Sequence, residues 1–191
     1  MEINKFIKCY DSVLPWDALS VFIRYINTAE FNVTGTISNT GEQTVDTNIR
    51  KTSEFSLYRQ HKSLTNVHWF SVFEHIIGNK LLQYQKDLSI IEMPVHSIIS
   101  LSVLKYTETS HYVWHTDHSG IGAPRTYSTI LFLNNDYEGG NLWFRDPDGS
   151  NEMKIETKAN RLIIWPSNFL FPHTVKPVTK GTRYSLVSWW I

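Results

Sequence analysis

The second half of the chain is a series of short segments rich in β-branched and aromatic residues, and this series limits the possible folds more than any other feature. Segments such as "HSIISLSVLKY", "RLIIW" and "TRYSLVSWWI" alternate with strong turn sequences such as "NNDYEGG" and "RDPDGSN". About eight strands at such close spacing favour a sandwich or a barrel, and a jelly roll is the common arrangement of eight strands. We therefore expect an all-β core over residues 95–191.

The first half of the chain mixes strand and helix periodicities. Residues 6–10 are strand-like, and residues 15–26 then follow helical spacing. A second helical pattern covers residues 63–88, in which Gly78 is expected to mark a break or a bend. The sequence thus predicts an α+β protein in which residues 1–94 support the β core within one structural domain.

A polar stretch, residues 32–53, lies between the two predicted helices. It consists mostly of Thr, Asn, Gly, Ser and charged residues and has little apolar surface to bury. We expect a long loop, and a loop of this length in a compact domain is either a mobile connection or a functional lid. The sequence leaves both alternatives open.

Composition excludes some functions. The 191 residues suit one domain, and 18 basic residues balance 18 acidic ones, so no general attraction to nucleic acid is expected. Cys9 is the single cysteine, which rules out an internal disulfide and fits a reducing compartment. The first residues lack the apolar core of a signal peptide, and no apolar run is long enough to cross a bilayer. We expect a soluble, cytoplasmic protein with no membrane partner.

The stretch "YVWHTD" places His115 and Asp117 two positions apart. Side chains two apart on a strand share a face, so one imidazole and one carboxylate can point the same way. Such a pair is weak evidence alone, because a chain with 8 histidines can contain it by chance. His173, in "FPHTV", is the candidate third ligand, although it also fits as a polar residue at a strand end. Two histidines and one carboxylate form the facial triad of non-haem Fe(II) oxygenases.

The last predicted strand carries a second polar pair, Arg183 and Ser185, which also share a face. An arginine fork and a hydroxyl on an otherwise apolar strip are suited to bind a carboxylate. Left unpaired inside a barrel the guanidinium would be costly, so it requires a protein carboxylate or a ligand. The alternative is a surface arginine at the start of the strand.

Three segments together resemble the 2-oxoglutarate- and Fe(II)-dependent oxygenases, and within them the prolyl 4-hydroxylase-like proteins. They are "YVWHTD", "RTYSTILFLNNDYEGGNLWF" and "NRLIIWPSNFLFPHTVKPVTKGTRYSLVSWW", which fall within residues 97–190. The resemblance implies a double-stranded β-helix, that is, a cupin-like jelly roll, with N-terminal buttressing helices. It also implies Fe(II), 2-oxoglutarate and O2, with ascorbate as a further candidate.

The resemblance implies roles for the two polar groups described above. His115, Asp117 and His173 would ligate Fe(II). Arg183 would pair with the far carboxylate of 2-oxoglutarate, assisted by Ser185. The retained carboxylate of Asp117 favours hydroxylation over halogenation.

The resemblance also implies residues around these groups. Tyr106 would support the cosubstrate, and Trp189 would lie deep behind it. Tyr112, Trp114 and Asn141 would line the mouth through which a substrate enters.

Two features depart from the family pattern. Phe132 stands where many prolyl hydroxylases have a tyrosine that helps to hold the cosubstrate, so another group must supply that hydrogen bond. The segment from Tyr106 to His115 lacks the glycines usual there.

The implied function is hydroxylation of a C–H bond, with succinate and CO2 as coproducts. The family favours a prolyl residue of a protein or peptide, and Tyr106, Tyr112 and Tyr127 could grip an extended chain. A free amino acid or another small molecule is the alternative substrate, and nucleic-acid dealkylation is not expected. An alternative of a different class is a non-catalytic, cupin-like metal-binding module, but such a module has no use for Arg183 and Ser185.

Overall fold

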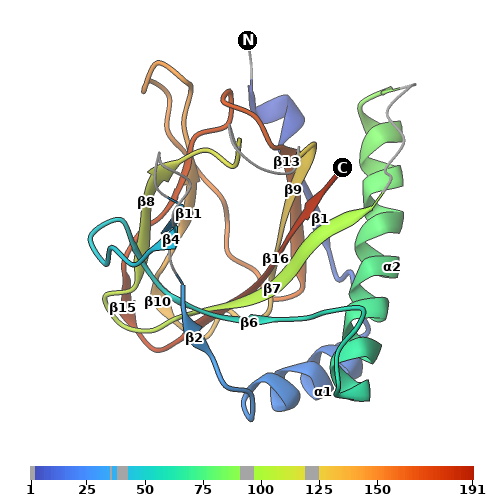
Figure 1. The fold of residues 1–191 in the computed structure, drawn as a ribbon. Helices are drawn as coiled ribbons and strands as arrows, with labels where there is room; N and C mark the ends of the chain where they lie inside the picture. Colours follow the sequence, from blue (N-terminus) through green and yellow to red (C-terminus); the bar gives the residue numbers. More distant parts are fainter. Residues whose placement is uncertain (1–2, 35, 38–42, 91–96, 119–124) are drawn as a thin grey trace.

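The computed structural model describes residues 3–34, 36–37, 43–90, 97–118 and 125–191, and most of its strands form two antiparallel sheets (Figure 1). The larger sheet has seven strands. In spatial order they are β1 (Lys8–Asp11), β13 (Arg161–Pro166), β9 (Tyr127–Phe132), β16 (Arg183–Trp190), β7 (Ile98–Tyr106), β6 (Ser53–Ser56) and β2 (Asn32–Val33). The smaller sheet has five, in the order β12 (Met153–Lys154), β11 (Leu142–Phe144), β14 (His173–Val175), β8 (His111–His115) and β5 (Arg50–Lys51).

Two short ribbons complete the β structure. They pair β10 (Glu138–Gly139) with β15 (Val178–Lys180), and β3 (Thr36–Ile37) with β4 (Gln43–Thr44). The two main sheets agree with the predicted jelly roll. Between Ile98 and Trp190 the described residues contain the strands β7 to β16. These strands outnumber those that the sequence pattern predicts, because several are only two or three residues long and leave no clear pattern.

The prediction of one long loop over residues 32–53 is wrong for the part that the structure describes. Strands β2, β3, β4 and β5 lie within it, and residues 35 and 38–42 of this stretch lie outside the described residues. Polar side chains do not prevent backbone pairing at a sheet edge, where one face stays in water and no apolar alternation is needed. Strand β2 pairs with β6 over only two residues, and a strand of this length is too short to show a periodic pattern in the sequence.

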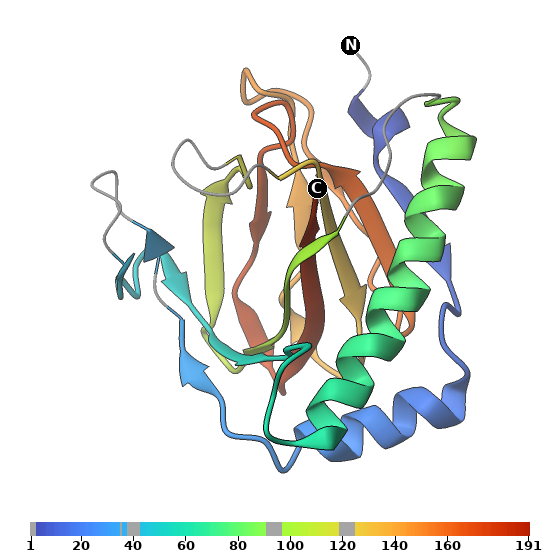
Figure 2. The same cartoon turned by 45° about the vertical axis from the view of Figure 1, so that its right-hand side comes forward.

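The helices cover the outer face of the larger sheet. Helix α2 (Leu64–Asp87) lies along the sheet and α1 (Trp16–Ile26) crosses near the N-terminal end of α2 (Figure 2). Helix α2 begins at Ser63, whose side chain accepts a hydrogen bond from the backbone N–H of Asn66, as expected of an N-cap. Gly78 causes no break in α2; it lies against the ring of Trp190 at the end of β16.

Each of the two main sheets contains strands from before position 94 and strands from after it. Strands β1, β2 and β6 extend the larger sheet, and β5 joins the smaller one. The N-terminal strand occupies Lys8–Asp11, slightly later than predicted, because it pairs in register with β13 and follows a 3-10 helix, η1 (Ile3–Phe6). No helix in the described part of the chain is long and apolar enough to cross a membrane.

Two apolar cores result, one on each face of the larger sheet. The outer core packs the helices against side chains such as Leu186 and Trp190 of β16. The inner core lies between the two sheets and includes Val187 of the same strand. Because side chains alternate along a strand, Arg183 and Ser185 share the inner face with Val187. The inner space is therefore where polar groups of a functional site can meet.

Candidate metal centre

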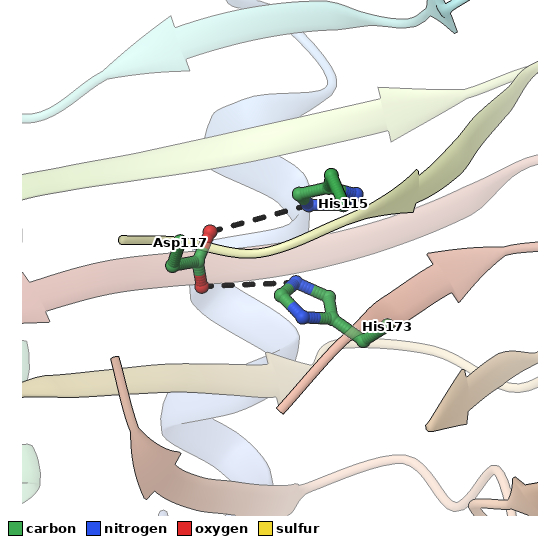
Figure 3. Close-up of side chains that lie close together, drawn as sticks. All are labelled: His115, Asp117 and His173. Atoms are coloured by element: carbon green, nitrogen blue, oxygen red, sulfur yellow. Dashed lines mark ion pairs between the residues drawn. The ribbon is translucent and has the colours of Figure 1, made fainter. Parts of the chain in front are cut away.

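Two histidines and one aspartate meet between the sheets. His115 ends β8 and His173 begins β14, and these antiparallel strands place the two residues directly opposite each other. Asp117 follows β8 by two residues and turns back toward both imidazoles (Figure 3). One potential ligand atom from each residue lies within 4.8 Å of the others. The structure thus brings together the three ligands expected from the sequence.

An irregularity in β8 shapes this cluster. His173 pairs with His115, whereas Val175 pairs with Tyr112, so β8 has one more residue than β14 over this stretch. Such a bulge turns Tyr112 and His115 to the same side. Their rings stack with centroids 3.5 Å apart. The aromatic ring therefore fixes one face of the His115 imidazole.

The imidazoles present their free nitrogens to the carboxylate. Nε2 of His115 lies 4.0 Å from Oδ1 of Asp117, and Nε2 of His173 lies 3.7 Å from Oδ2. Both separations are too long for hydrogen bonds. Nδ1 of His115 lies 2.8 Å from the Val113 carbonyl, and Nδ1 of His173 lies 3.0 Å from the Phe171 carbonyl. These carbonyls hold the proton on Nδ1, which leaves each Nε2 lone pair for a metal.

The local electrostatics favour the deprotonated ligands that a metal requires. Burial, and then the neighbouring His173, lower the pKa of His115 to about 3, so its imidazole is neutral near pH 7. Burial alone would raise the pKa of Asp117. The two histidines and hydrogen bonds from Ser128 and Trp189 outweigh that effect, and the pKa lies below its ordinary value. A carboxylate and two imidazoles fit a divalent metal of the iron type.

A second feature, a fully buried arginine, lies on the same inner face. Arg183 is 0% exposed, and its Nη1 donates to Ser185 Oγ at 3.1 Å. Its Nε and Nη2 atoms are buried and have no hydrogen-bond partner in the structure. The rings of Tyr106 and Phe132 lie 4.8 and 5.3 Å from the guanidinium carbon. A desolvated cation with unused donors is costly unless an anion binds, so this arrangement fits a carboxylate ligand.

The Gly-Gly pair after β10 makes room for this arginine. Gly140 has a φ of 59°, in the left-handed region that favours glycine. A Cβ atom there would lie 2.8 Å from Val178 Cγ2 and 3.1 Å from Arg183 Cδ. Any larger residue would therefore displace the arginine or the strand beside it.

The other predicted site residues are distributed more widely. Tyr106 is 1% exposed and pairs in register with Arg183. Trp189 contacts the metal cluster directly, because its side chain hydrogen-bonds to Asp117. The ring of Trp114 lies beneath the Arg145 guanidinium, at 4.3 Å, and within 5.3 Å of Lys176 Nζ.

Asn141 and Tyr127 were also expected near the substrate. The backbone carbonyl of Asn141 accepts a hydrogen bond from the Lys176 N–H. The expectation that Tyr127 helps to grip a substrate chain is wrong. Its ring packs on Tyr84 of α2, because alternation along β9 turns Ser128 inward and Tyr127 outward.

Three residues near the cluster escaped the sequence analysis. Ser128 hydrogen-bonds to Asp117, and strict alternation back from Phe132 would have placed it on the inner face. Arg125 stacks over the Trp189 ring at 3.9 Å and donates to the Asp117 carbonyl at 3.3 Å. Arg50 lies 4.9 Å from the Tyr112 ring, on a strand within the stretch expected to be a loop. Only Ser128 had a signal in the sequence.

Fold and site together define a class of protein. Two antiparallel sheets enclose two imidazoles, a carboxylate and a buried arginine, so this is a jelly-roll protein whose inner space holds a cluster that could bind a divalent metal. A family model described as "2OG-Fe(II) oxygenase superfamily" matches residues 101–191. That part of the chain is therefore similar to this superfamily, in agreement with the resemblance seen in the sequence.

Curated relatives indicate the same family. A PKHD-type hydroxylase of Synechococcus sp. (strain CC9902) is 35% identical over 121 residues, which cover 62% of this chain and 50% of that protein. Human prolyl 3-hydroxylase 2 is 39% identical over 66 residues, or 34% of this chain and 9% of that protein. The chain thus spans about half the length of the first of these relatives and far less of the second. The names of the family and the relatives indicate a 2-oxoglutarate-dependent, prolyl hydroxylase-like oxygenase.

Solved structures confirm the type of fold. A prolyl hydroxylase from Trichoplax adhaerens, in complex with a peptide fragment of hypoxia inducible factor, has a TM-score of 0.74 at 17% identity and covers 98% of this chain and 84% of its own. A Pseudomonas putida prolyl-4-hydroxylase has a TM-score of 0.68 at 21% identity and covers 97% of this chain and 91% of its own. At these identities the likeness shows a shared jelly roll.

Proposed function

We propose that this chain is an Fe(II)- and 2-oxoglutarate-dependent dioxygenase that hydroxylates a prolyl residue of a protein or peptide and forms succinate and CO2. One observation carries the proposal: the cluster of His115, Asp117 and His173 shares the inner space with Arg183, whose Nε and Nη2 have no partner among the described residues. The metal ligands alone would suit many metalloproteins. The buried, unsatisfied guanidinium adds the need for an anionic ligand.

The residues present fit the metal and the cosubstrate. His115 and His173 would hold Fe(II) through Nε2, and Asp117 through its carboxylate. Bound Fe(II) with 2-oxoglutarate supplies the activation of O2 that hydroxylation of an unactivated C–H bond requires. Arg183 would receive the far carboxylate of 2-oxoglutarate on its two free donor groups.

The surrounding side chains orient these groups and exclude water. Ser185 holds one guanidinium nitrogen, which directs the remaining donors. The rings of Tyr106 and Phe132 flank the guanidinium and make its surroundings apolar. Trp189 and Ser128 fix the Asp117 carboxylate by hydrogen bonds. A ligand carboxylate in this dry pocket would bind more strongly than in water.

The prolyl substrate is supported by the names of the relatives, which include prolyl hydroxylases in both comparisons. A free amino acid or another small molecule is the second candidate substrate, and ascorbate is a candidate additive for turnover. A non-catalytic metal-binding module is disfavoured because it leaves the Arg183 donors without a purpose.

The first test is anaerobic binding of Fe(II) or Mn(II) and then of 2-oxoglutarate, followed by turnover of prolyl peptides. His173→Ala should abolish tight metal binding, whereas His111→Ala, on the same strand as His115 but outside the cluster, should not. Arg183→Ala should keep the metal but weaken 2-oxoglutarate roughly 10- to 100-fold, since charge-assisted hydrogen bonds contribute about 1.5–3 kcal/mol. Equal metal affinity in wild type and His173→Ala would refute the site. A metal-loaded wild type without affinity for 2-oxoglutarate would favour the binding module.

A further inference from the structure

A cavity of about 620 Å³ lies over the edge strands β2 and β6, outside the metal cluster. Its walls include two glutamates, two hydroxyl side chains and two rings. These are Glu30, Glu54, Thr34, Ser56, Tyr58 and His61. None of these residues has a part in the proposed chemistry.

Strand register places Glu54 and Ser56 of this cavity on the same face of the larger sheet as the metal cluster, whereas Phe55, which also lines the cavity, packs in the outer core. Glu54 pairs with Leu104 of the inner core, and Ser56 pairs with Ser102, where the two hydroxyl oxygens lie 3.1 Å apart. In Figure 1, β6 lies between β7 and β2 at this edge of the sheet. The Glu54 and Ser56 side chains therefore share the space in front of the sheet with the cluster.

Register also gives the distance from the cluster. Ser102 pairs with Val187, and Trp189, two residues further along β16, hydrogen-bonds to Asp117. Adjacent strands are about 4.8 Å apart and residues rise about 3.3 Å, so along the sheet Ser56 lies on the order of 12 Å from Trp189, the residue that contacts the cluster. An extended peptide covers about 3.3–3.6 Å per residue. A substrate chain would therefore reach the cavity in roughly three or four residues.

The chemistry of the cavity is that of a cation site. Neither Glu30 nor Glu54 forms an ion pair with any residue that the structure describes; Glu54 accepts one hydrogen bond, from Ser56 Oγ at 3.0 Å. The Thr34 side chain provides a second, independent indication. It is 6% exposed, lines the cavity and has a buried hydroxyl without a partner in the part of the chain that the structure describes.

The rings add an apolar surface to these acceptors. Tyr58 and His61 stack with centroids 6.3 Å apart at an interplanar angle of 12°, and Tyr58 is 55% exposed. Carboxylates, a hydroxyl acceptor and an aromatic face together suit an ammonium or guanidinium group on a long aliphatic stem. A neutral or acidic side chain would leave both carboxylates without a counter-charge.

We infer that this cavity binds a lysine or arginine side chain of the peptide substrate, three or four residues from the prolyl residue that is hydroxylated. The inference rests on the proposed function and makes it more specific. The substrate class is then a basic peptide segment, and Glu54 and Glu30 determine that preference.

The test is a set of otherwise neutral prolyl peptides with one lysine placed one to six residues from the proline on either side. We expect kcat/KM for hydroxylation to peak when the lysine is three or four residues away, at roughly tenfold above the all-neutral peptide, as for one well-placed ion pair. Arginine in place of lysine separates the two cations. Binding to the Mn(II)- and 2-oxoglutarate-loaded protein should show the same preference.

Variants test the residues. Glu54→Gln and Glu30→Gln should remove the advantage of the basic peptide and leave the neutral peptide unchanged, and Glu54→Lys should shift the preference toward a peptide with glutamate at that position. Glu152→Gln, at an exposed site elsewhere, is the matched control. Thr34→Val tests the hydroxyl with little change of shape.

The outcomes separate this inference from the proposed function. Turnover of neutral and basic peptides at the same rate for all spacings would overturn the cavity assignment and keep the hydroxylase. A preference that persists unchanged in both glutamate variants would also overturn it. Absence of turnover with every prolyl peptide would refute the proposed function and this inference with it.

Discussion

At the scale of single residues, the buried arginine has the greatest consequence, because nothing in the structure satisfies it completely. Among the described residues Arg183 has one side-chain hydrogen-bond partner, Ser185, and two donor atoms without any. A buried cation of this kind destabilises the protein unless an anion occupies the pocket. The stability of the chain should therefore rise when the anion binds, since a ligand of the native state shifts the unfolding equilibrium.

Ser185→Ala tests how far the hydroxyl directs this arginine. The change removes the acceptor of Nη1, so the guanidinium loses its fixed direction, and we expect 2-oxoglutarate affinity to fall about 3- to 10-fold, the equivalent of one hydrogen bond. Isothermal titration of the Mn(II)-loaded protein measures this. Ser188→Ala is the matched control, because its hydroxyl bonds to Thr129 and Trp190 rather than to the arginine. Equal effects of the two variants would contradict a positioning role for Ser185.

At the scale of elements, α2 shows where sequence patterns mislead. A glycine in a helix interior costs stability, so Gly78 predicts a break, yet the helix runs through it with Trp190 packed alongside. A Cβ at this position would meet the nearest Trp190 atom at 3.7 Å, an ordinary contact. Gly78→Ala should therefore stabilise the protein by about 0.5–1 kcal/mol, the difference in helix propensity. Chemical denaturation measures this change in the free energy of unfolding. A loss of stability would mean that the added methyl group clashes with the Trp190 ring.

The edge strand β1 provides a pH-dependent prediction. Hydrogen bonds from Arg161 and Lys158 hold the pKa of Asp11 well below its usual range. A lowered folded-state pKa means that Asp11 contributes stability above the unfolded pKa of about 4 and loses it as the pH falls. Because Asp11 is 37% exposed, Asp11→Asn should cost no more than about 1 kcal/mol at pH 7, and less in high salt. The difference should shrink below about pH 4; an equal penalty at about pH 7 and pH 2.5 would contradict the ion pair.

The individual strands differ in how well the sequence predicts them. Long strands such as β7 and β16 have clear patterns, and His115, Asp117 and His173 were found because a metal constrains residue type as well as spacing. Tyr127 was misplaced because every residue of β9 is buried, so polarity does not mark its face, and only alternation counted back from Phe132 would have turned it outward. The bulge that brings Tyr112 onto His115 depends on pairing with β14, which local sequence does not encode.

At the scale of the whole molecule, the larger sheet separates two tasks. Its inner face holds the metal cluster and Arg183, and its outer face packs against the helices. Substitutions in the outer core should lower stability without changing ligand distances. The inner face can thus keep an unsatisfied cation because the outer core supplies stability independently.

This division makes the N-terminal half essential to the fold. Residues 1–94 contribute β1, β6 and β2 to the seven-stranded sheet, together with α1 and α2. Each fully buried apolar side chain contributes about 1.5–3 kcal/mol. The four helix residues Phe22, Phe73, Ile77 and Leu81 are at most 1% exposed, so their loss alone removes at least about 6 kcal/mol. Whole domains are stable by only about 5–15 kcal/mol.

A fragment of residues 95–191 should therefore fail to fold, although it contains every proposed metal ligand. We expect no cooperative thermal transition, a near-ultraviolet circular dichroism spectrum without fixed aromatic signals, and no tight Mn(II) binding. The full chain measured under the same conditions is the control. A fragment that melts cooperatively and binds metal would show that the matched region 101–191 is an autonomous domain. The strands and helices before it would then have another purpose, and the sheet edge near Glu54 and Glu30 would be the first place to look for it.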